Sequence, residues 1–248
     1  MKKIKRIVLF KFHKEFEICK NRLEILRKFN PDIPIYGLYG GQRKDYKNAK
    51  KLDIPISMIP SDDWYWKWRN GDLSLRWWYK QAGHKIDFDM LHVFEWDLIL
   101  FDSVENYFRD IKNGIAMSNV QLLAPIYDHW IWTAEKLGRI EYLELIKLAK
   151  KKFKYRKKAL AGNCGGLCLS KKFLEEYSRI DEMPSLCNDE VRLLLFAQCL
   201  NMKIRNIKIP SKKFFNVDQN EILPEEVLRS SQEGIKLFHP VWQKLILP

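Results

Sequence analysis

Apolar and polar residues follow two different periods along the first hundred residues. The apolar run Arg6–Phe12 predicts a β-strand, and the helical spacing of apolar residues after it predicts a helix that ends at Asn30. Further short apolar runs predict strands over residues 34–39, 54–59 and 89–97. Strands separated by helices favour an α/β chain with a mostly parallel sheet that is covered on both faces.

The second half of the chain is less regular. We expect strands over residues 120–126, 165–169 and 203–209, and helices over 134–150 and 191–200. Helix starts are expected from capping residues: Asp72 for a helix that stops near Gly83, Ser170 for a helix directly after the strand over 165–169, and Asn188 or Asp189 for the last helix. The chain has no internal repeat and no Gly- and Ser-rich linker, so one domain over residues 1–248 is the simplest interpretation.

Composition and charge narrow the class of protein. Hydrophobic residues make up 46% of the 248 residues, which excludes a disordered, collagen-like or coiled-coil chain. Lys and Arg total 44 against 31 Asp and Glu, a net charge of +13, which predicts attraction to nucleic acid, to lipid headgroups or to the phosphates of a small substrate. The dense basic block 150–158 is usually a solvated face in proteins of this kind, and it is alternatively a contact for an anionic membrane or a phosphorylated acceptor.

The expected location follows from the apolar runs and the cysteines. No apolar run approaches the roughly 20 residues that a membrane-spanning helix needs. The five cysteines are odd in number and scattered, which favours reduced thiols. We therefore expect a cytoplasmic protein, with the basic block as a route to peripheral contact with a membrane.

Two carboxylates lie at the end of the most strand-like segment. In Glu95-Trp96-Asp97 the acids alternate, so both side chains can converge on one point at the edge of the sheet where α/β proteins bind ligands. Oxygen ligands of this kind suit Mg²⁺ or Mn²⁺ carrying a diphosphate. The alternative is an acidic strand end that is simply exposed to water.

Three further groups have both a structural and a functional interpretation. Asn188-Asp189-Glu190 precedes an apolar helix, where acidic residues also favour the helix dipole. Gly165 and Gly166 either form a tight turn or let the backbone approach a ligand closely. His239 is a lone histidine, which becomes a metal ligand only if other ligands lie near it.

In this order along the chain, these residues resemble the GT-A-type glycosyltransferases, which move a sugar from a nucleotide-sugar onto an acceptor. Glu95-Trp96-Asp97 resembles the Asp-x-Asp metal motif, and residues 161–174 are similar to the glycine-rich strand and helix that line the sugar and acceptor pocket. Asp189 and Glu190 resemble the acidic motif that supplies the catalytic base of inverting members, and His239 the C-terminal metal ligand. The chain departs from the pattern twice, with Glu as the first acid of the metal motif and Asp-Glu in place of Glu-Asp.

The resemblance implies a fold and an activity. The fold is a single-domain GT-A-like three-layer αβα sandwich with a mostly parallel, Rossmann-like sheet, in which residues 1–100 form the nucleotide-binding half and residues 101–248 the acceptor-binding half. The activity is metal-dependent, inverting, hexosyltransferase-like transfer from a UDP-, GDP- or dTDP-sugar to a glycan, a lipid-linked or another hydroxyl acceptor. The implied metal is Mn²⁺ or Mg²⁺, held by Glu95, Asp97 and His239, and the implied base is Glu190 or Asp189. The residues expected at the donor are His13, Tyr39, Gly40, Asp62, Asp63, Arg76, Trp96, Gly165 and Gly166.

Other classes of protein remain as alternatives. A nucleic-acid-binding protein or metal-dependent nuclease would use the same charge and carboxylates, but the chain lacks a zinc knuckle, an RNP-like strand and a helix-turn-helix pattern, so no nucleic acid is expected. A non-catalytic sugar-binding protein would not need the intact acids. A nucleotidyltransferase would show a glycine-rich loop after the first strand, where this chain has residues 11–14 without glycine. The tryptophans of segment 64–68 and the pair at 77–78 either stack on sugars or fill the core, and the core is favoured for at least Trp77 or Trp78.

Overall fold

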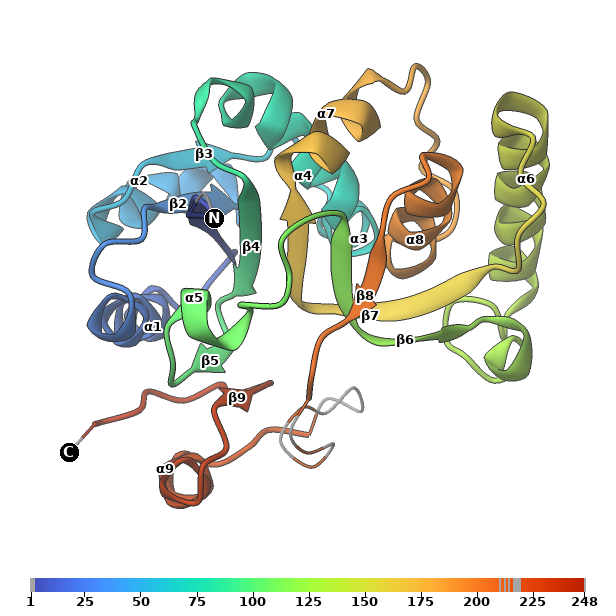
Figure 1. Cartoon of the computed structure of the whole chain (residues 1–248). Helices are drawn as coiled ribbons and strands as arrows, with labels where there is room; N and C mark the ends of the chain where they lie inside the picture. The colour runs from blue at the N-terminus through green and yellow to red at the C-terminus, as the bar shows by residue number, and fades with distance from the viewer. Residues whose placement is uncertain (1–2, 210, 212, 214, 216–219, 248) are drawn as a thin grey trace.

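A mixed seven-stranded sheet forms the centre of the molecule (Figure 1). The computed structural model describes residues 3–209, 211, 213, 215 and 220–247, and within them the strand order is β3-β2-β1-β4-β7-β6-β8. The strands are β1 (Arg6–Phe12), β2 (Ile35–Tyr39), β3 (Ile56–Met58), β4 (Met90–Glu95), β6 (Ile115–Leu122), β7 (Leu160–Ser170) and β8 (Ile204–Asn206). Only β7 runs against its neighbours in this sheet, and the other pairs are parallel. The expected mostly parallel α/β sheet is confirmed.

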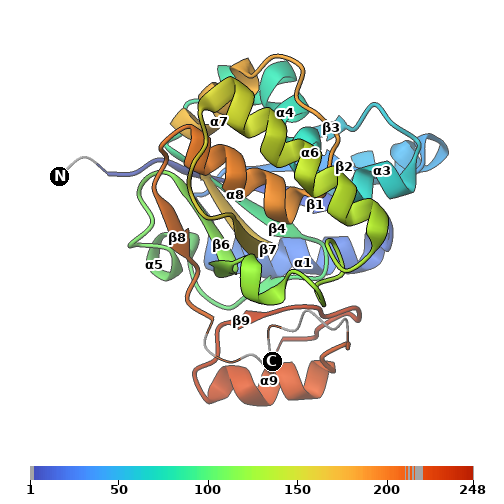
Figure 2. The ribbon, with the colours of Figure 1, turned by 90° about the vertical axis from the view of Figure 1, so that its right-hand side faces the viewer.

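Helices cover both faces of the sheet, which confirms the three-layer arrangement (Figure 2). Ile7 and Leu9 of β1 pack on the face covered by α4, α6, α7 and α8, whereas Val8 and Phe10 pack on the face covered by α1. This alternation is what a strand buried on both faces requires. The helices are α1 (Phe16–Phe29), α2 (Tyr46–Ala49), α3 (Trp64–Arg69), α4 (Gly71–Gln81), α5 (Val104–Tyr107), α6 (Lys136–Phe153), α7 (Lys171–Arg179), α8 (Asp189–Cys199) and α9 (Pro224–Gln232). Short 3₁₀ turns are η1 (Arg43–Asp45), η2 (Lys50–Leu52), η3 (Gly83–Lys85) and η4 (Ala124–Ile126).

A small two-stranded sheet attaches the C-terminal segment to the main sheet. Strand β5 (Ile99–Leu100) pairs antiparallel with β9 (Leu237–Phe238). A separate cluster of buried apolar residues, including Ile25 of α1 and Val227 of α9, lies beneath this pairing. The pairing brings the residues after β9 back to the end of β4. Among the described residues, no helix is both long and apolar enough to cross a membrane.

The structure corrects several predicted elements. The strand expected over 120–126 is β6, which begins at Ile115 and ends at Leu122, because its pairing with β7 sets both of its ends. The 3₁₀ turn η4 takes the place of the last expected strand residues. Strand β7 begins at Leu160, earlier than the expected residue 165, because its pairing with β6 extends to Leu160. Strand β4 ends at Glu95, so the rest of the acidic motif lies in a turn.

The predicted capping role of Asp72 is wrong. Asn70 is the residue that precedes α4, and Asp72 lies inside the first turn with 1% of its surface exposed. A buried cation explains this position, since Arg192 pairs with the carboxylate. Ser170 caps α7 as expected, since it accepts a hydrogen bond from the Phe173 amide. Asn188 directly precedes α8, but its side chain makes no capping hydrogen bond.

Candidate active site

Three potential metal ligands meet beyond the carboxyl end of β4. Glu95 is the last residue of that strand, Asp97 follows in the turn, and His239 directly follows β9. The Nε2 atom of His239 lies 3.8 Å from Oε2 of Glu95 and 3.6 Å from Oδ1 of Asp97. The β5–β9 pairing and a hydrogen bond from the Val241 amide to the Asp97 carbonyl, 2.8 Å long, hold the two chain segments together. The structure therefore brings together the three ligands expected from the sequence.

The donor set of this cluster fits a divalent cation. One ligand atom from each of Glu95, Asp97 and His239 lies within 4.8 Å of the others. Ligands that share one Mg²⁺ or Mn²⁺ at about 2.1 Å lie within about 4 Å of one another, so the separations from Nε2 are already in that range. Two carboxylates with one imidazole are hard and borderline ligands that suit Mn²⁺ or Mg²⁺.

The two carboxyls of the cluster differ in their electrostatics. Burial raises the pKa of Asp97, and the neighbouring Glu95 carboxylate raises it further, although His239 opposes both. Burial would also raise the pKa of Glu95, but Lys11 and His239 lower it below its usual value. Glu95 is therefore the more readily ionised of the two acids in the absence of a cation.

Lys11 links the metal cluster to the second acidic motif. Its Nζ lies 3.2 Å from Oε1 of Glu95, its partner in the β1–β4 ladder. A Cβ atom added to Gly71, the first residue of α4, would lie 3.0 Å from Lys11 Nζ and would collide with Oδ2 of Asp189. Glu95 and Asp189 are therefore both close neighbours of one ammonium group. The two acidic motifs lie on the same side of the molecule, as the sequence interpretation requires.

Asp189 and Glu190 form the first turn of α8 and have different surroundings. Nε1 of Trp132 donates to Oε2 of Glu190 at 2.7 Å, and Nδ2 of Asn163 donates to Oε1 at 3.2 Å. Burial raises the pKa of Glu190, and these two hydrogen bonds partly oppose the rise. Burial and the nearby Asp72 raise the pKa of Asp189 to about 8, although Lys11 opposes them. Asp189 is 7% exposed, whereas Glu190 is partly accessible.

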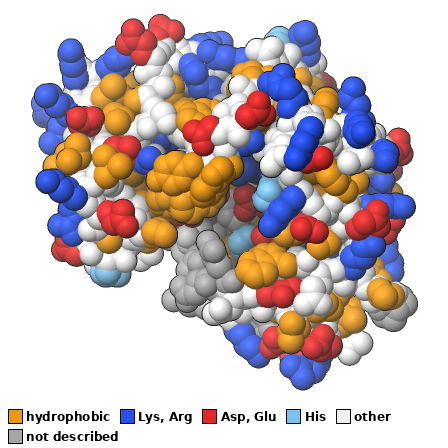
Figure 3. Space-filling view, turned by 180° about the vertical axis from the view of Figure 1, so that it is seen from behind, with side chains coloured by type: hydrophobic (Ala, Val, Ile, Leu, Met, Phe, Trp, Pro, Cys, Tyr) orange, Lys and Arg blue, Asp and Glu red, His pale blue; other side chains and the backbone are white. Residues whose placement is uncertain are grey.

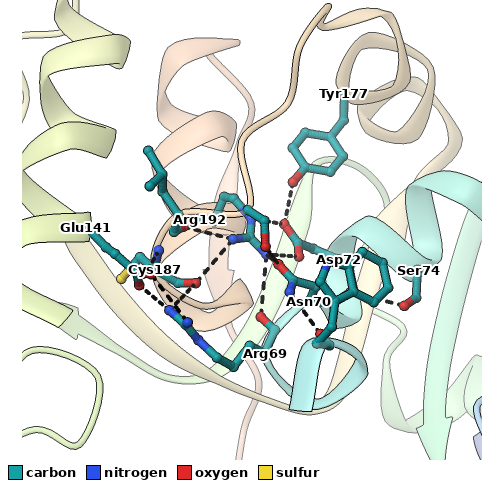
Figure 4. A network of polar contacts seen from close by, with 11 residues as sticks. Arg69, Asn70, Asp72, Ser74, Glu141, Tyr177, Cys187 and Arg192 are labelled. Carbon is teal, nitrogen blue, oxygen red and sulfur yellow. Dashed lines mark hydrogen bonds and ion pairs between the residues drawn. The ribbon is translucent and has the colours of Figure 1, made fainter. Parts of the chain in front are cut away.

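A buried ion-pair network supports this turn from below (Figure 4). Arg192 of α8 donates from Nη2 and Nε to the two oxygens of Asp72 at 2.5 and 2.7 Å, and both side chains are fully buried. Tyr177 of α7 donates to Asp72 at 2.5 Å, and Arg69 of α3 pairs with Glu141 of α6. The network joins α3, α4, α6, α7 and α8. It thereby fixes the acidic turn of α8 against the start of α4.

An aromatic wall adjoins Glu190. The rings of Trp68 and Trp132 lie 4.7 Å apart, and Trp64 and Tyr65 of the same helix as Trp68 are 72% and 46% exposed. Figure 3 shows a hollow on this side of the molecule, with a hydrophobic patch beside it and acidic and histidine side chains within it. The sequence had not indicated Trp132, because its role depends on a contact with α8. The core position expected for Trp78 is confirmed by its exposure of 1%.

Three of the predicted donor-binding residues are engaged in structural contacts. The Arg76 guanidinium donates to backbone carbonyls at the end of α7, including that of Ile180. Asp63 caps α3 by accepting from two backbone amides, and Asp62 lies 3.7 Å from Arg43 in an exposed ion pair. These contacts give each residue a structural role, and none of them points to a diphosphate.

The other predicted donor residues lie at the carboxyl ends of the central strands. The ring of His13 meets the ring of Trp96 edge-on, with centroids 5.6 Å apart, just beyond β1 and β4. Tyr39 is buried and donates to the Gln42 carbonyl at 3.0 Å, and Gly40 follows it at the end of β2. His13 and Trp96 therefore flank the metal cluster, whereas the Tyr39 side chain belongs to the core.

The paired glycines of β7 lie beside His239. A Cβ atom added to Gly165 would lie 2.8 Å from the Phe215 ring and 3.7 Å from Nδ1 of His239. Gly166 has a φ of +71°, a conformation that L-residues rarely adopt. The absence of a side chain at Gly165 lets the Phe215 ring approach the sheet, and Phe215 forms a β-bridge with His239.

The chain is similar in fold to solved galactosyltransferase structures at low sequence identity. No family model matches the chain, and no curated protein matches it. Among solved structures, the galactosyltransferase LgtC in complex with donor and acceptor sugar analogs is similar at 13% identity, over 98% of this chain and 84% of that chain, with a TM-score of 0.44. An active-site mutant of LgtC is similar at 12% identity, over 89% of this chain and 75% of that chain, with a TM-score of 0.43.

Proposed function

We propose that the protein is a metal-dependent glycosyltransferase that moves a sugar from a nucleotide-sugar to an acceptor hydroxyl with inversion at the anomeric carbon. The observation that carries the proposal is the position of Lys11, whose ammonium group is a close neighbour of both Glu95 of the metal cluster and Asp189 of the α8 turn. A cation site and a basic carboxylate at one edge of a parallel sheet are what a displacement at a diphosphate-activated sugar needs.

In this proposal Glu95, Asp97 and His239 hold Mn²⁺ or Mg²⁺. When bound, such an ion neutralises the charge that develops on the departing nucleoside diphosphate. His13 and Trp96 beside the cluster, and Gly40 at the end of the next strand, support a donor that lies across the ends of the strands in residues 1–100. His239 belongs to the other half of the chain, so both halves contribute to the donor site.

Glu190 is the better of the two acids for the role of base. The hydrogen bonds from Trp132 and Asn163 fix the orientation of its carboxylate, and the side chain is partly accessible. Asp189 is packed against Gly71. Glu190 would take the proton of the acceptor hydroxyl while the oxygen bonds to the anomeric carbon and the bond to the diphosphate breaks. Its raised pKa brings the base closer to neutral pH, where general bases are most effective.

A thermal-shift screen with UDP-, GDP- and dTDP-sugars, each with and without Mn²⁺, tests the proposal. A ligand that binds the folded state adds about 2.7 kcal/mol of stability at a hundredfold excess over Kd. We expect one nucleotide class to raise Tm only when Mn²⁺ is present, and the Asp97→Ala variant to lose that shift. Equal shifts in Asp97→Ala and the parent, or a shift only with an oligonucleotide, would contradict the proposal.

A further inference from the structure

The outer face of α6 combines apolar and basic residues in two separate zones. The inner face packs on the core through Leu145 and Ala149, which are fully buried. The opposite face, which is exposed, presents three aliphatic side chains, then one acid and three lysines: Leu137, Ile140, Leu143, Glu144, Lys147, Lys150 and Lys151. Their spacing of three or four residues places them on one side of the helix. Figure 2 shows α6 lying across the outside of the molecule.

The exposure of these aliphatic residues is large. Leu137, Ile140 and Leu143 are 60%, 45% and 61% exposed, and Ile131 just before the helix is 62% exposed. Single exposed apolar residues are common, but a contiguous group of large ones marks a surface that contacts another apolar body. The apolar half of α6 is therefore a contact surface that the described part of the chain leaves uncovered.

The aromatic wall of α3 adjoins this half of α6. The ion pair between Arg69 and Glu141 joins the two helices, and the Trp68 ring contacts Trp132 in the segment that leads into α6. We call the outer residues of α6 together with Trp64, Tyr65, Trp68 and Ile131 the α6 surface. Apolar and aromatic groups occupy one end of it, and the basic block that continues to residue 158 occupies the other.

We propose that the α6 surface docks on an anionic lipid bilayer. Leucine, isoleucine and tryptophan side chains enter the headgroup region of a bilayer, and lysines beside them bind acidic headgroups. The net charge of +13 complements such a membrane. A nucleic acid would engage the lysines but would leave the aliphatic residues uncovered, so the combination favours lipid.

The position of the α6 surface gives docking a consequence for the reaction. Trp132, whose ring contacts Trp68 in the aromatic wall, donates a hydrogen bond to Glu190. A hydroxyl carried by a molecule in the membrane would reach the proposed base from this side. This consequence rests on the proposed function, whereas docking itself does not.

Sedimentation with lipid vesicles tests the proposal without donor, metal or acceptor. The full chain is mixed with phosphatidylcholine vesicles, with or without about 30 mol% phosphatidylglycerol, at about 0.1 M and about 0.5 M salt. We expect binding to the anionic vesicles that weakens at the higher salt, together with a blue shift of tryptophan fluorescence. Failure of the chain to bind anionic vesicles at the lower salt overturns the proposal, whatever the outcome of the nucleotide screen.

Matched variants separate the α6 surface from net charge. The combined Lys147→Glu, Lys150→Glu and Lys151→Glu variant should bind anionic vesicles about tenfold or more weakly. The control carries Lys44→Glu, Lys47→Glu and Lys51→Glu, exposed lysines in and around α2, which lies at the opposite end of the sheet in Figure 1. The control variant should bind anionic vesicles no more than about twofold more weakly than the parent. Equal losses in the two variants overturn the proposal.

A second variant tests the apolar half of the surface. Leu137→Gln combined with Leu143→Gln removes two exposed side chains and leaves the charge unchanged. We expect weaker vesicle binding at both salt concentrations and a smaller blue shift. Unchanged vesicle binding by this variant contradicts the proposal, as does tighter binding to a single-stranded oligonucleotide than to vesicles. A thermal melt shows that each variant is folded.

Discussion

The indole nitrogen of Trp132 lies 2.7 Å from Oε2 of Glu190, although 58 residues separate them along the chain. This hydrogen bond joins the aromatic wall to the acidic turn of α8. Because Asn163 of β7 donates to the other oxygen, the carboxylate is held from two sides while it stays partly accessible. Glu190 thus has the fixed orientation that a general base needs.

Trp132→Phe should slow transfer by removing one donor to Glu190 while keeping the ring. A hydrogen bond to a charged group contributes about 1.5–3 kcal/mol, which corresponds to about a 10- to 100-fold loss of kcat at neutral pH. The hydrogen bond lowers the pKa of Glu190, so its loss should raise that pKa and move the acidic limb of the kcat profile to higher pH. A kcat–pH profile of both proteins measures this. An unshifted limb would argue against Glu190 as the base, and Trp64→Phe serves as the exposed control.

Stability should fall as pH rises because of Asp189. Its pKa is about 8 in the folded chain and about 3.9 in an unfolded one, so the folded state binds this proton more tightly between those values. The stability that the group contributes is complete below about pH 4 and is lost as pH rises toward about 8. Asp189→Asn cannot ionise, so its Tm relative to that of the parent should improve from pH 5 to pH 8. Thermal melts at matched ionic strength measure the difference, and a constant difference would refute the burial argument.

Arg192→Met should destabilise the fold by about 3–5 kcal/mol, because it leaves the Asp72 carboxylate buried without its cation. Urea denaturation measures the free energy of unfolding. The double variant with Asp72→Leu should lose less than the single variant, since no buried charge remains. Lys244→Ala breaks an exposed pair with Glu17 and should leave the free energy of unfolding nearly unchanged. Equal costs for the buried and the exposed pair would contradict the role of the network.

Local sequence patterns predicted the elements whose burial is regular. Strand β1 and the end of α1 fall where the apolar periods place them, because both faces of β1 are buried and α1 has one buried face. The start of β6 was missed because its pairing with β7 determines it. Asp72 was taken for a cap because an acid near a helix start looks the same in sequence whether it caps the helix or pairs with a cation 120 residues away.

The candidate site could be predicted only in part, because some of its residues are brought together by contacts between segments that are distant in sequence. Glu95 and Asp97 are close in sequence, and the resemblance implied His239, so the sequence predicted all three residues of the metal cluster. Lys11 and Trp132 were not predicted, because their roles arise from contacts between distant segments. A charged residue near the end of an otherwise apolar strand was the only signal for Lys11 in the sequence.

The central claim is that the metal cluster binds the donor and the α8 turn deprotonates the acceptor in one reaction, and paired measurements on two variants test it most directly. Donor binding and transfer are measured with Mn²⁺ for the nucleotide-sugar found in the screen, in Asp97→Ala and in Glu190→Gln. The account predicts that Asp97→Ala loses metal-dependent donor binding, whereas Glu190→Gln binds the donor normally and loses about 100-fold or more in kcat. Normal transfer by either variant would contradict it.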